Sequence, residues 1–364
     1  MELISLASGA SYFHTPSVAS QVAIKGIQEH KTFYGSPEGT LALRQAIVNR
    51  YKQVNNASVN LGQVIVTPGT KQALYNILQA ILQPGDEVIV PIPNWGGLYQ
   101  VLQHLKAKIV LLPTSPEDGY TINPEALASL ITANTKLFLF TNPNNPSGRI
   151  YNKTEISQWL EVLDNHPEVY VLSDEVYDLV TFEKSIPSLY EFEDKFNRFL
   201  VVNGFSKSFA MTGWRLGYLI CPLELSQKCI EFQHIIYGNV PEFIQDAGVA
   251  ILENISAVQA PIFTALKENK QQMELFLVDQ HIPYFKSEAA YYYFPDLSGY
   301  LNDVVPDSYQ LADYLKRNYK VEILPGDLFG APGFARLSFA IQKNKLIEAL
   351  KRLQEAFTQI KNLS

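Results

Sequence analysis

Residues 203–218 read NGFSKSFAMTGWRLGY, and one lysine, Lys207, stands there among small, apolar and hydroxylated residues. An amine that is desolvated or placed near other cations loses its charge, and an uncharged amine can condense with an aldehyde to form a Schiff base. Eight positions on, Arg215 supplies a permanent cation whose planar fork suits a phosphate. F-S-K alone is a weak signal, because most lysines are solvated surface residues, but the whole run is much more specific.

The run SKSFAMTGWRLGY resembles the lysine segment of the class I/II aminotransferases of fold type I, a family that includes aspartate aminotransferase and uses pyridoxal phosphate (PLP). The resemblance implies that Lys207 forms the internal aldimine with PLP, with Ser206 beside it. It also implies that Arg215 holds the cofactor phosphate. Gly204 departs from the family, because many members have a serine there that helps to bind the phosphate.

Short apolar segments alternate with helical patterns along most of the chain, which indicates an α/β fold: a mostly parallel sheet covered on both faces, with ligands at the carboxyl ends of its strands. Strands are predicted at 63–67, 88–90, 109–113, 136–142, 169–173, 199–203 and 216–220. A long helical stretch at 223–280 should be broken at Pro241 and Pro261, and the tail, with strands at 283–285, 291–295, 321–324 and 335–340, reads as α+β. A chain of 364 residues is too long for one simple core. We therefore predict a large PLP-binding domain at 35–250 and a small domain formed by both chain ends, 1–34 and 251–364.

A strand, a glycine turn and a helix follow one another at 63–82, where Pro68-Gly69-Thr70 precedes a helix that starts at Lys71. The free N–H groups and the dipole of a helix N-terminus favour anions. Alone, this is an ordinary turn. With the family resemblance it becomes the phosphate cup, with Gly69, Thr70 and Lys71 as contacts, and Trp95 of the P-x-W segment is implied to stack on the pyridine ring.

Two predicted strand ends carry further motifs. Asn145-Pro146-Ser147-Gly148 matches the family's N-P-x-G, and 173–177 match its S-D-E-x-Y. A carboxylate buried at a strand end requires a cation, and a protonated pyridine nitrogen is such a partner. The resemblance implies that Asp174 keeps the ring nitrogen protonated, while Asn145 and Tyr177 share the phenolate oxygen of PLP.

Three more residues are implied by the resemblance. Arg336, in a segment like R-L-S-x-A, grips the substrate carboxylate, and Gly9 lies near the substrate. The pattern Y-G-x-x-x-G-x-x-x-L-R matches at Tyr34, which in the family reaches the neighbouring subunit's cofactor phosphate. The active unit is therefore predicted to be a homodimer with shared active sites.

The composition excludes several classes of function. A net charge of −7 argues against a nucleic-acid-binding surface, and the start of the chain has neither a basic region nor a long apolar run. The only two cysteines, Cys221 and Cys229, are too few for a disulfide framework and lack zinc spacing. The expectation is a cytoplasmic protein without a metal site, a membrane partner or a nucleic-acid partner.

These observations predict a PLP-dependent aminotransferase that moves an amino group between an amino acid and a 2-oxo acid in a ping-pong cycle. The alternative is a PLP lyase or synthase on the same fold, such as a carbon–sulfur β-lyase. A PLP-binding regulator would need a DNA-binding domain, and a nicotinamide dehydrogenase would need a G-x-G-x-x-G after a strand. A neutral or aromatic donor is predicted over aspartate, with 2-oxoglutarate or pyruvate as acceptor, because the candidates for the specificity wall are aromatic: Tyr12, Phe13, Tyr237, Tyr291 and Tyr292.

Overall fold

The protein is described by a computed structural model that covers residues 2–182 and 184–362. Its centre is a seven-stranded sheet in the order β2-β8-β7-β6-β5-β3-β4. These strands are β2 (Val64–Thr67), β3 (Glu87–Ile92), β4 (Lys108–Pro113), β5 (Thr135–Thr141), β6 (Tyr170–Asp174), β7 (Phe199–Gly204) and β8 (Gly217–Ile220). Strand β8 runs opposite to the six other strands of this sheet, which are parallel to one another, so the predicted mostly parallel α/β architecture is confirmed.

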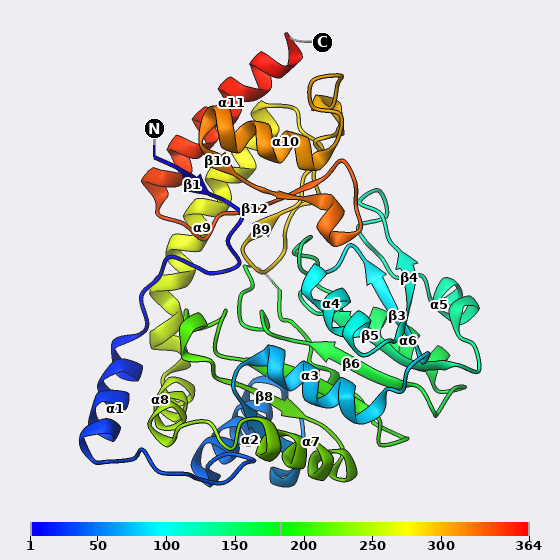
Figure 1. The fold of residues 1–364 in the computed structure, drawn as a ribbon, viewed down its shortest axis with the longest axis vertical. Coiled ribbons are helices and arrows are strands. Elements are labelled where there is room, and N and C mark those ends of the chain that lie inside the picture. The colour runs from blue at the N-terminus through cyan, green and yellow to red at the C-terminus, as the bar shows by residue number, and fades with distance from the viewer. Residues whose placement is uncertain (1, 183, 363–364) are drawn as a thin grey trace.

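Helices cover both faces of the sheet, because successive side chains of a buried strand point to opposite sides. In β5, for example, Phe138 and Phe140 pack into one hydrophobic layer, while Leu137 and Leu139 pack into the other. The first layer contains α1 (Ser17–Gln28), α2 (Leu41–Asn55), α5 (Pro124–Leu130), α6 (Lys153–Leu163) and α8 (Glu242–Glu253). The second contains α3 (Thr70–Ile81), α4 (Gly96–His104) and α7 (Leu223–Ile236) (Figure 1).

A second group of elements forms a separate hydrophobic core above the sheet, where both ends of the chain lie (Figure 1). Its helices are α9 (Ile255–Asp279), α10 (Ser308–Tyr314) and α11 (Lys343–Lys361), and its strands are β1 (Ile4–Ser5), β9 (Tyr292–Tyr293), β10 (Val321–Glu322), β11 (Leu324–Pro325) and β12 (Ala335–Ser338). Strand β1 pairs with β10, so Ile4 belongs to this core, whereas Ala19 of α1 packs in the large one. The domain boundaries at 34 and 250 stay a prediction.

Two local predictions were wrong. Pro261 lies inside α9 and does not break it; the chain bends by 78° between α8 and α9, at Asn254. A proline removes one helical hydrogen bond, and the buried face of this 25-residue helix outweighs that loss. Residues 283–285 form no strand: Pro283 has no N–H to donate, and its carbonyl accepts a single bond from Asp296.

Within the described ranges, no single helix has the length and apolarity needed to cross a membrane, and only the bent pair α8 and α9 passes that test when taken together.

Candidate functional site

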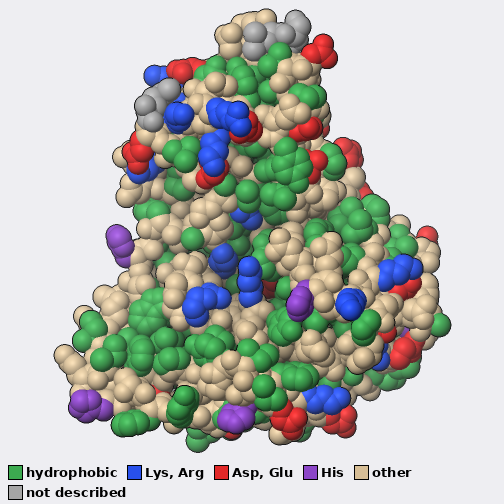
Figure 2. Space-filling view, in the orientation of Figure 1, with side chains coloured by type: hydrophobic (Ala, Val, Ile, Leu, Met, Phe, Trp, Pro, Cys, Tyr) green, Lys and Arg blue, Asp and Glu red, His purple; other side chains and the backbone are tan. Residues whose placement is uncertain are grey.

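A cavity of about 360 Å³ opens where the parallel strands end, between the sheet and the upper core. All the predicted site residues except Gly69 and Tyr34 line it. Its basic side chains outnumber its acidic ones: Lys71, Lys207, Arg215 and Arg336 face a single carboxylate, Asp174. Figure 2 shows Lys and Arg side chains gathered between the broad lower part and the narrower upper part. Such a cavity selects ligands that carry several negative charges.

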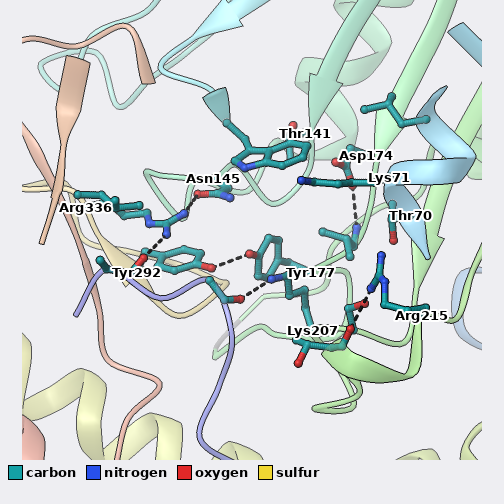
Figure 3. Close-up of a pocket in the computed structure, with 18 residues that line it drawn as sticks. Thr70, Lys71, Thr141, Asn145, Asp174, Tyr177, Lys207, Arg215, Tyr292 and Arg336 are labelled. Carbon is teal, nitrogen blue, oxygen red and sulfur yellow. Dashed lines mark hydrogen bonds between the residues drawn. The ribbon is translucent and has the colours of Figure 1, made fainter. Parts of the chain in front are cut away.

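Lys207 lies in the turn after β7, and its amine points into the cavity (Figure 3). The amine donates a hydrogen bond to the carbonyl of Gly9, in the N-terminal segment. Burial lowers the pKa of Lys207, and the positive charges of Arg336 and Arg215 act in the same direction, against Asp174. An amine with a lowered pKa is a better nucleophile at neutral pH.

Asp174 is the last residue of β6, and its carboxylate lies at the floor of the cavity. Burial raises the pKa of Asp174 to about 6, while a hydrogen bond from the backbone N–H of Val176 and the charge of Lys207 oppose that rise. A carboxylate held in this way gains from a cationic partner, such as a protonated ring nitrogen.

The N-terminus of α3 forms one end of the cavity and has no side-chain cap. Gly69 precedes it with φ of +86°, and a Cβ there would collide with the guanidinium of Arg215. Within the described residues, the buried hydroxyl of Thr70 has no hydrogen-bond partner. An uncapped helix end, an orphan hydroxyl and an arginine together make an anion site that fits a phosphate.

Gly204 explains one departure from the family pattern. A Cβ at this position would lie 2.8 Å from the Thr70 hydroxyl oxygen and 3.0 Å from the Gly217 Cα, so a serine there would crowd the Thr70 side chain and the backbone at the start of β8. Ser206, two residues further on, is buried and lines the cavity.

Arg336, on β12, enters the cavity from the upper core. Its Nη1 donates to the side-chain oxygen of Asn145 at 3.0 Å, and its Nη2 donates to the carbonyl of Ala7 at 2.7 Å. Its Nε is buried and has no partner among the described residues. This guanidinium, 4.2 Å above the ring of Tyr292, is placed to bind a carboxylate.

Asn145 and Tyr177 were predicted to act on the same oxygen, and the structure places both in the cavity. Each contacts a residue of the upper core: Asn145 binds Arg336, and the Tyr177 hydroxyl lies 2.7 Å from that of Tyr292 (Figure 3). Burial raises the pKa of Tyr177, which keeps the phenol protonated. Trp95 lines the same wall, with the amine of Lys71 at 5.1 Å from its ring centroid.

Sequence reasoning did not place Tyr292 beside the predicted site residues Tyr177 and Arg336. It was predicted only as part of a specificity wall, yet it contacts both Tyr177 and Arg336. Four of the five predicted wall residues, Tyr12, Phe13, Tyr237 and Tyr291, are not among the residues that line the cavity. In a strand, successive side chains of the run 291–293 point to opposite faces. The sequence does not show which of these faces is turned toward the cavity.

Tyr34 lies away from the cavity of its own chain. It is 95% exposed, and Gly238, at the end of α7, is its neighbour.

Comparison with known proteins places these features in a family context. Residues 1–353 match the family described as aminotransferase class I and II. The chain is 32% identical to an aspartate aminotransferase of Pinus pinaster, over 97% of this chain and 74% of that protein. It is 30% identical to a probable aspartate/prephenate aminotransferase of Aquifex aeolicus, over 99% of this chain and 92% of that protein. The structure of Thermus thermophilus aspartate aminotransferase with maleate superimposes with a TM-score of 0.91 at 32% identity, covering 97% of this chain and 91% of that one.

Proposed function

Because this chain belongs to the class I and II aminotransferase family, we propose that the cavity around Lys207 carries out its PLP-dependent transamination, with Lys207 as the residue that binds the cofactor covalently. The observation that carries this assignment is that the amine of Lys207, whose pKa is lowered by desolvation, lines one cavity with the carboxylate of Asp174 and the guanidinium of Arg215. When bound, pyridoxal phosphate supplies an aldehyde for the amine and a ring that accepts electrons from the substrate.

The cavity fits this cofactor at three points. Thr70, Arg215 and the α3 terminus would hold the phosphate, since the Thr70 hydroxyl lacks a partner among the described residues and the helix end lacks a cap. Asp174 would bind the ring nitrogen, and Trp95 would cover the ring face. Asn145 and Tyr177 would donate to the ring oxygen from the opposite side.

The remaining residues bind the substrate and move a proton. Arg336 orients the amino acid by its α-carboxylate, and Gly9 leaves room beside it, since a Cβ there would lie 3.4 Å from the Lys207 amine. As a free amine, Lys207 would take the Cα proton of the substrate and return it as a general acid. To accept this proton, the Lys207 amine must be uncharged. Desolvation lowers its pKa and so favours the uncharged form.

The lyase alternative is not favoured, because the relatives are named aminotransferases over nearly the whole length of this chain. We expect purified protein to convert an amino acid and a 2-oxo acid into the exchanged pair with ping-pong kinetics. Release of pyruvate and ammonia from a donor without any 2-oxo acid would overturn this function.

The donor class depends on Lys71. The predicted preference for a neutral or aromatic donor now rests on Tyr292, because it alone of the five predicted wall residues lines the cavity. This preference also requires that Lys71 bind the cofactor phosphate together with Arg215. An acidic donor is favoured by a second observation: the Lys71 amine reaches across the cavity over Trp95, away from Arg215 (Figure 3). Relatives named as aspartate aminotransferases, one of them in complex with the dicarboxylate maleate, support the same donor.

Substitution of Lys71 separates these two assignments. If Lys71 binds a distal carboxylate, Lys71→Met should raise the KM for aspartate about 10-fold and leave neutral and aromatic donors unchanged. If Lys71 serves the phosphate, all donors should be affected alike and the cofactor should dissociate more easily. The measurement is the rate at which each amino acid changes the absorbance of the bound cofactor. Lys136→Met, which removes a lysine over Tyr170 outside the cavity, is the matched control.

We further propose a homodimer in which Tyr34 completes the partner's phosphate site. Support comes from large apolar side chains that are exposed in the single chain: Phe33 at 79%, Tyr34 at 95% and Ile235 at 79% exposure. Side chains of this kind gather at interfaces between subunits.

Mixed dimers test the shared site. Tyr34→Ala and Lys207→Ala, each nearly inactive alone, should regain up to about a quarter of wild-type activity after subunit exchange, since one site of each mixed dimer is intact. Lys207→Ala mixed with Asp174→Asn is the control: both residues line the same cavity, so no intact site arises. A fully active monomer in sedimentation would contradict the proposal.

A further inference from the structure

A buried ion pair lies beneath the cavity, outside the residues that line it. Asp178 follows Tyr177 directly, and its side chain is 10% exposed. It pairs with Arg50 of α2, whose side chain is 3% exposed. A buried pair of this kind contributes little net stability, because desolvation of both charges offsets their attraction. Stabilisation of the fold therefore does not explain why this ion pair lies next to Tyr177.

The carboxylate of Asp178 binds both flanks of the Lys207 segment. One oxygen accepts a hydrogen bond from the Asn203 side chain at 2.8 Å, four residues before Lys207. The other accepts from the Ser208 hydroxyl at 3.5 Å, one residue after Lys207. A single side chain thus connects the loop after β6 with the end of β7 and with the turn that presents the amine.

Arg50 closes this network from the other side. Its Nη1 donates to the Tyr218 hydroxyl at 3.1 Å, and Tyr218 lies opposite Asn203 where β8 pairs with β7. Its guanidinium also supplies the opposite charge that a buried carboxylate such as Asp178 requires. The network therefore fixes the relative positions of two strand ends that carry reacting groups.

Resting on the assignment of Lys207 above, we propose that Asp178 is a positioning residue: it holds the Lys207 turn in register with the loop after β6. Reacting groups must be aligned to within about 1 Å, and a misplacement of that size lowers rates about 100-fold. Through their hydrogen bonds to Asp178, Asn203 and Ser208 connect the turn that carries the Lys207 amine to the loop that follows Asp174.

The first test variant removes the hydrogen bonds from Asn203 and Ser208 to Asp178 and leaves the ion pair between Arg50 and Asp178 in place. In Asn203→Ala/Ser208→Ala, Arg50 and Asp178 stay paired, so the protein should fold. We expect kcat to fall about 10- to 100-fold with KM for both substrates within about twofold of wild type. In cofactor-free protein, amide hydrogen exchange of residues 204–209 should rise several-fold, as measured by mass spectrometry. Arg50→Met/Asp178→Leu removes both charges together with the acceptor oxygens for Asn203 and Ser208, and it should give the same pattern.

The matched control lies at the other end of β7. Arg198 and Asp164 form a second tie there, with the Arg198 side chain 3% exposed and bonded to Asp164 at 2.9 Å. Arg198→Met/Asp164→Asn should lower the melting temperature by a comparable amount without changing kcat or exchange at 204–209.

Three outcomes overturn the proposal: unchanged kcat in both test variants, a loss seen equally in the control, or unchanged exchange in residues 204–209. Failure of the function itself would look different. The wild-type protein would then show no borohydride-fixed cofactor on Lys207, whereas the exchange comparison needs no cofactor.

Discussion

Lys207→Ala should abolish transamination, with kcat reduced by at least about 10⁴-fold, because this residue both attaches the cofactor and moves the Cα proton. Borohydride should fix cofactor to one peptide of the wild-type protein, the one that contains Lys207, and to no peptide of the variant. The cofactor-free variant should fold at least as stably as the wild type, because the buried amine, whose pKa is lowered by desolvation, is removed.

The control for this experiment is Lys184→Ala, which removes an exposed lysine that pairs with Glu288 and is not among the residues that line the cavity. It should keep full activity and the same labelled peptide. Persistent cofactor fixation in Lys207→Ala would show that another amine carries the cofactor.

Asp174→Asn should leave the cofactor attached to Lys207 but lower kcat about 10²- to 10³-fold, because a neutral amide no longer holds a proton on the ring nitrogen. Single-turnover absorbance measurements with a saturating donor would follow the loss. Wild-type kcat in the Asp174→Asn variant would contradict the assignment of the ring-nitrogen partner.

The same substitution has a signature in stability without cofactor. The pKa of Asp174 is raised from 3.8 to about 6 in the folded protein, so the folded state binds a proton more tightly than the unfolded state. The contribution of Asp174 to the stability of the cofactor-free wild type should therefore fall as the pH rises from 3.8 to about 6. In Asp174→Asn this contribution is missing, and unfolding in urea at several pH values would measure the difference.

Motifs that lie at strand ends could be predicted because the sequence contains both the motif and the strand before it. Asp174 follows an apolar strand, Asn145 follows another, and parallel strands bring their carboxyl ends to one edge of the sheet. Lys207 and Arg215 are close in the chain, so their common site needed no knowledge of distant contacts. Arg336, by contrast, was assigned by resemblance, and only the position of β12 shows that it reaches Asn145.

Predictions that depended on packing were less secure. Pro261 was expected to break a helix, but a buried face that continues on both sides of it keeps α9 intact. The wall residues Tyr12, Phe13, Tyr237 and Tyr291 were chosen as aromatic side chains near the motifs, and none of them is among the residues that line the cavity.

The sequence by itself determined the alternation of strands and helices, the order of the motifs and the identity of the groups that carry the chemistry, because hydrophobic period and local residue type are properties of short segments. Only the tertiary structure decided which side chains meet across the chain: Tyr292 with Tyr177, and Asp178 with Arg50 and Asn203. These contacts join residues separated by 25 to 128 positions, and their geometry depends on how the sheet, its helices and the upper core pack together.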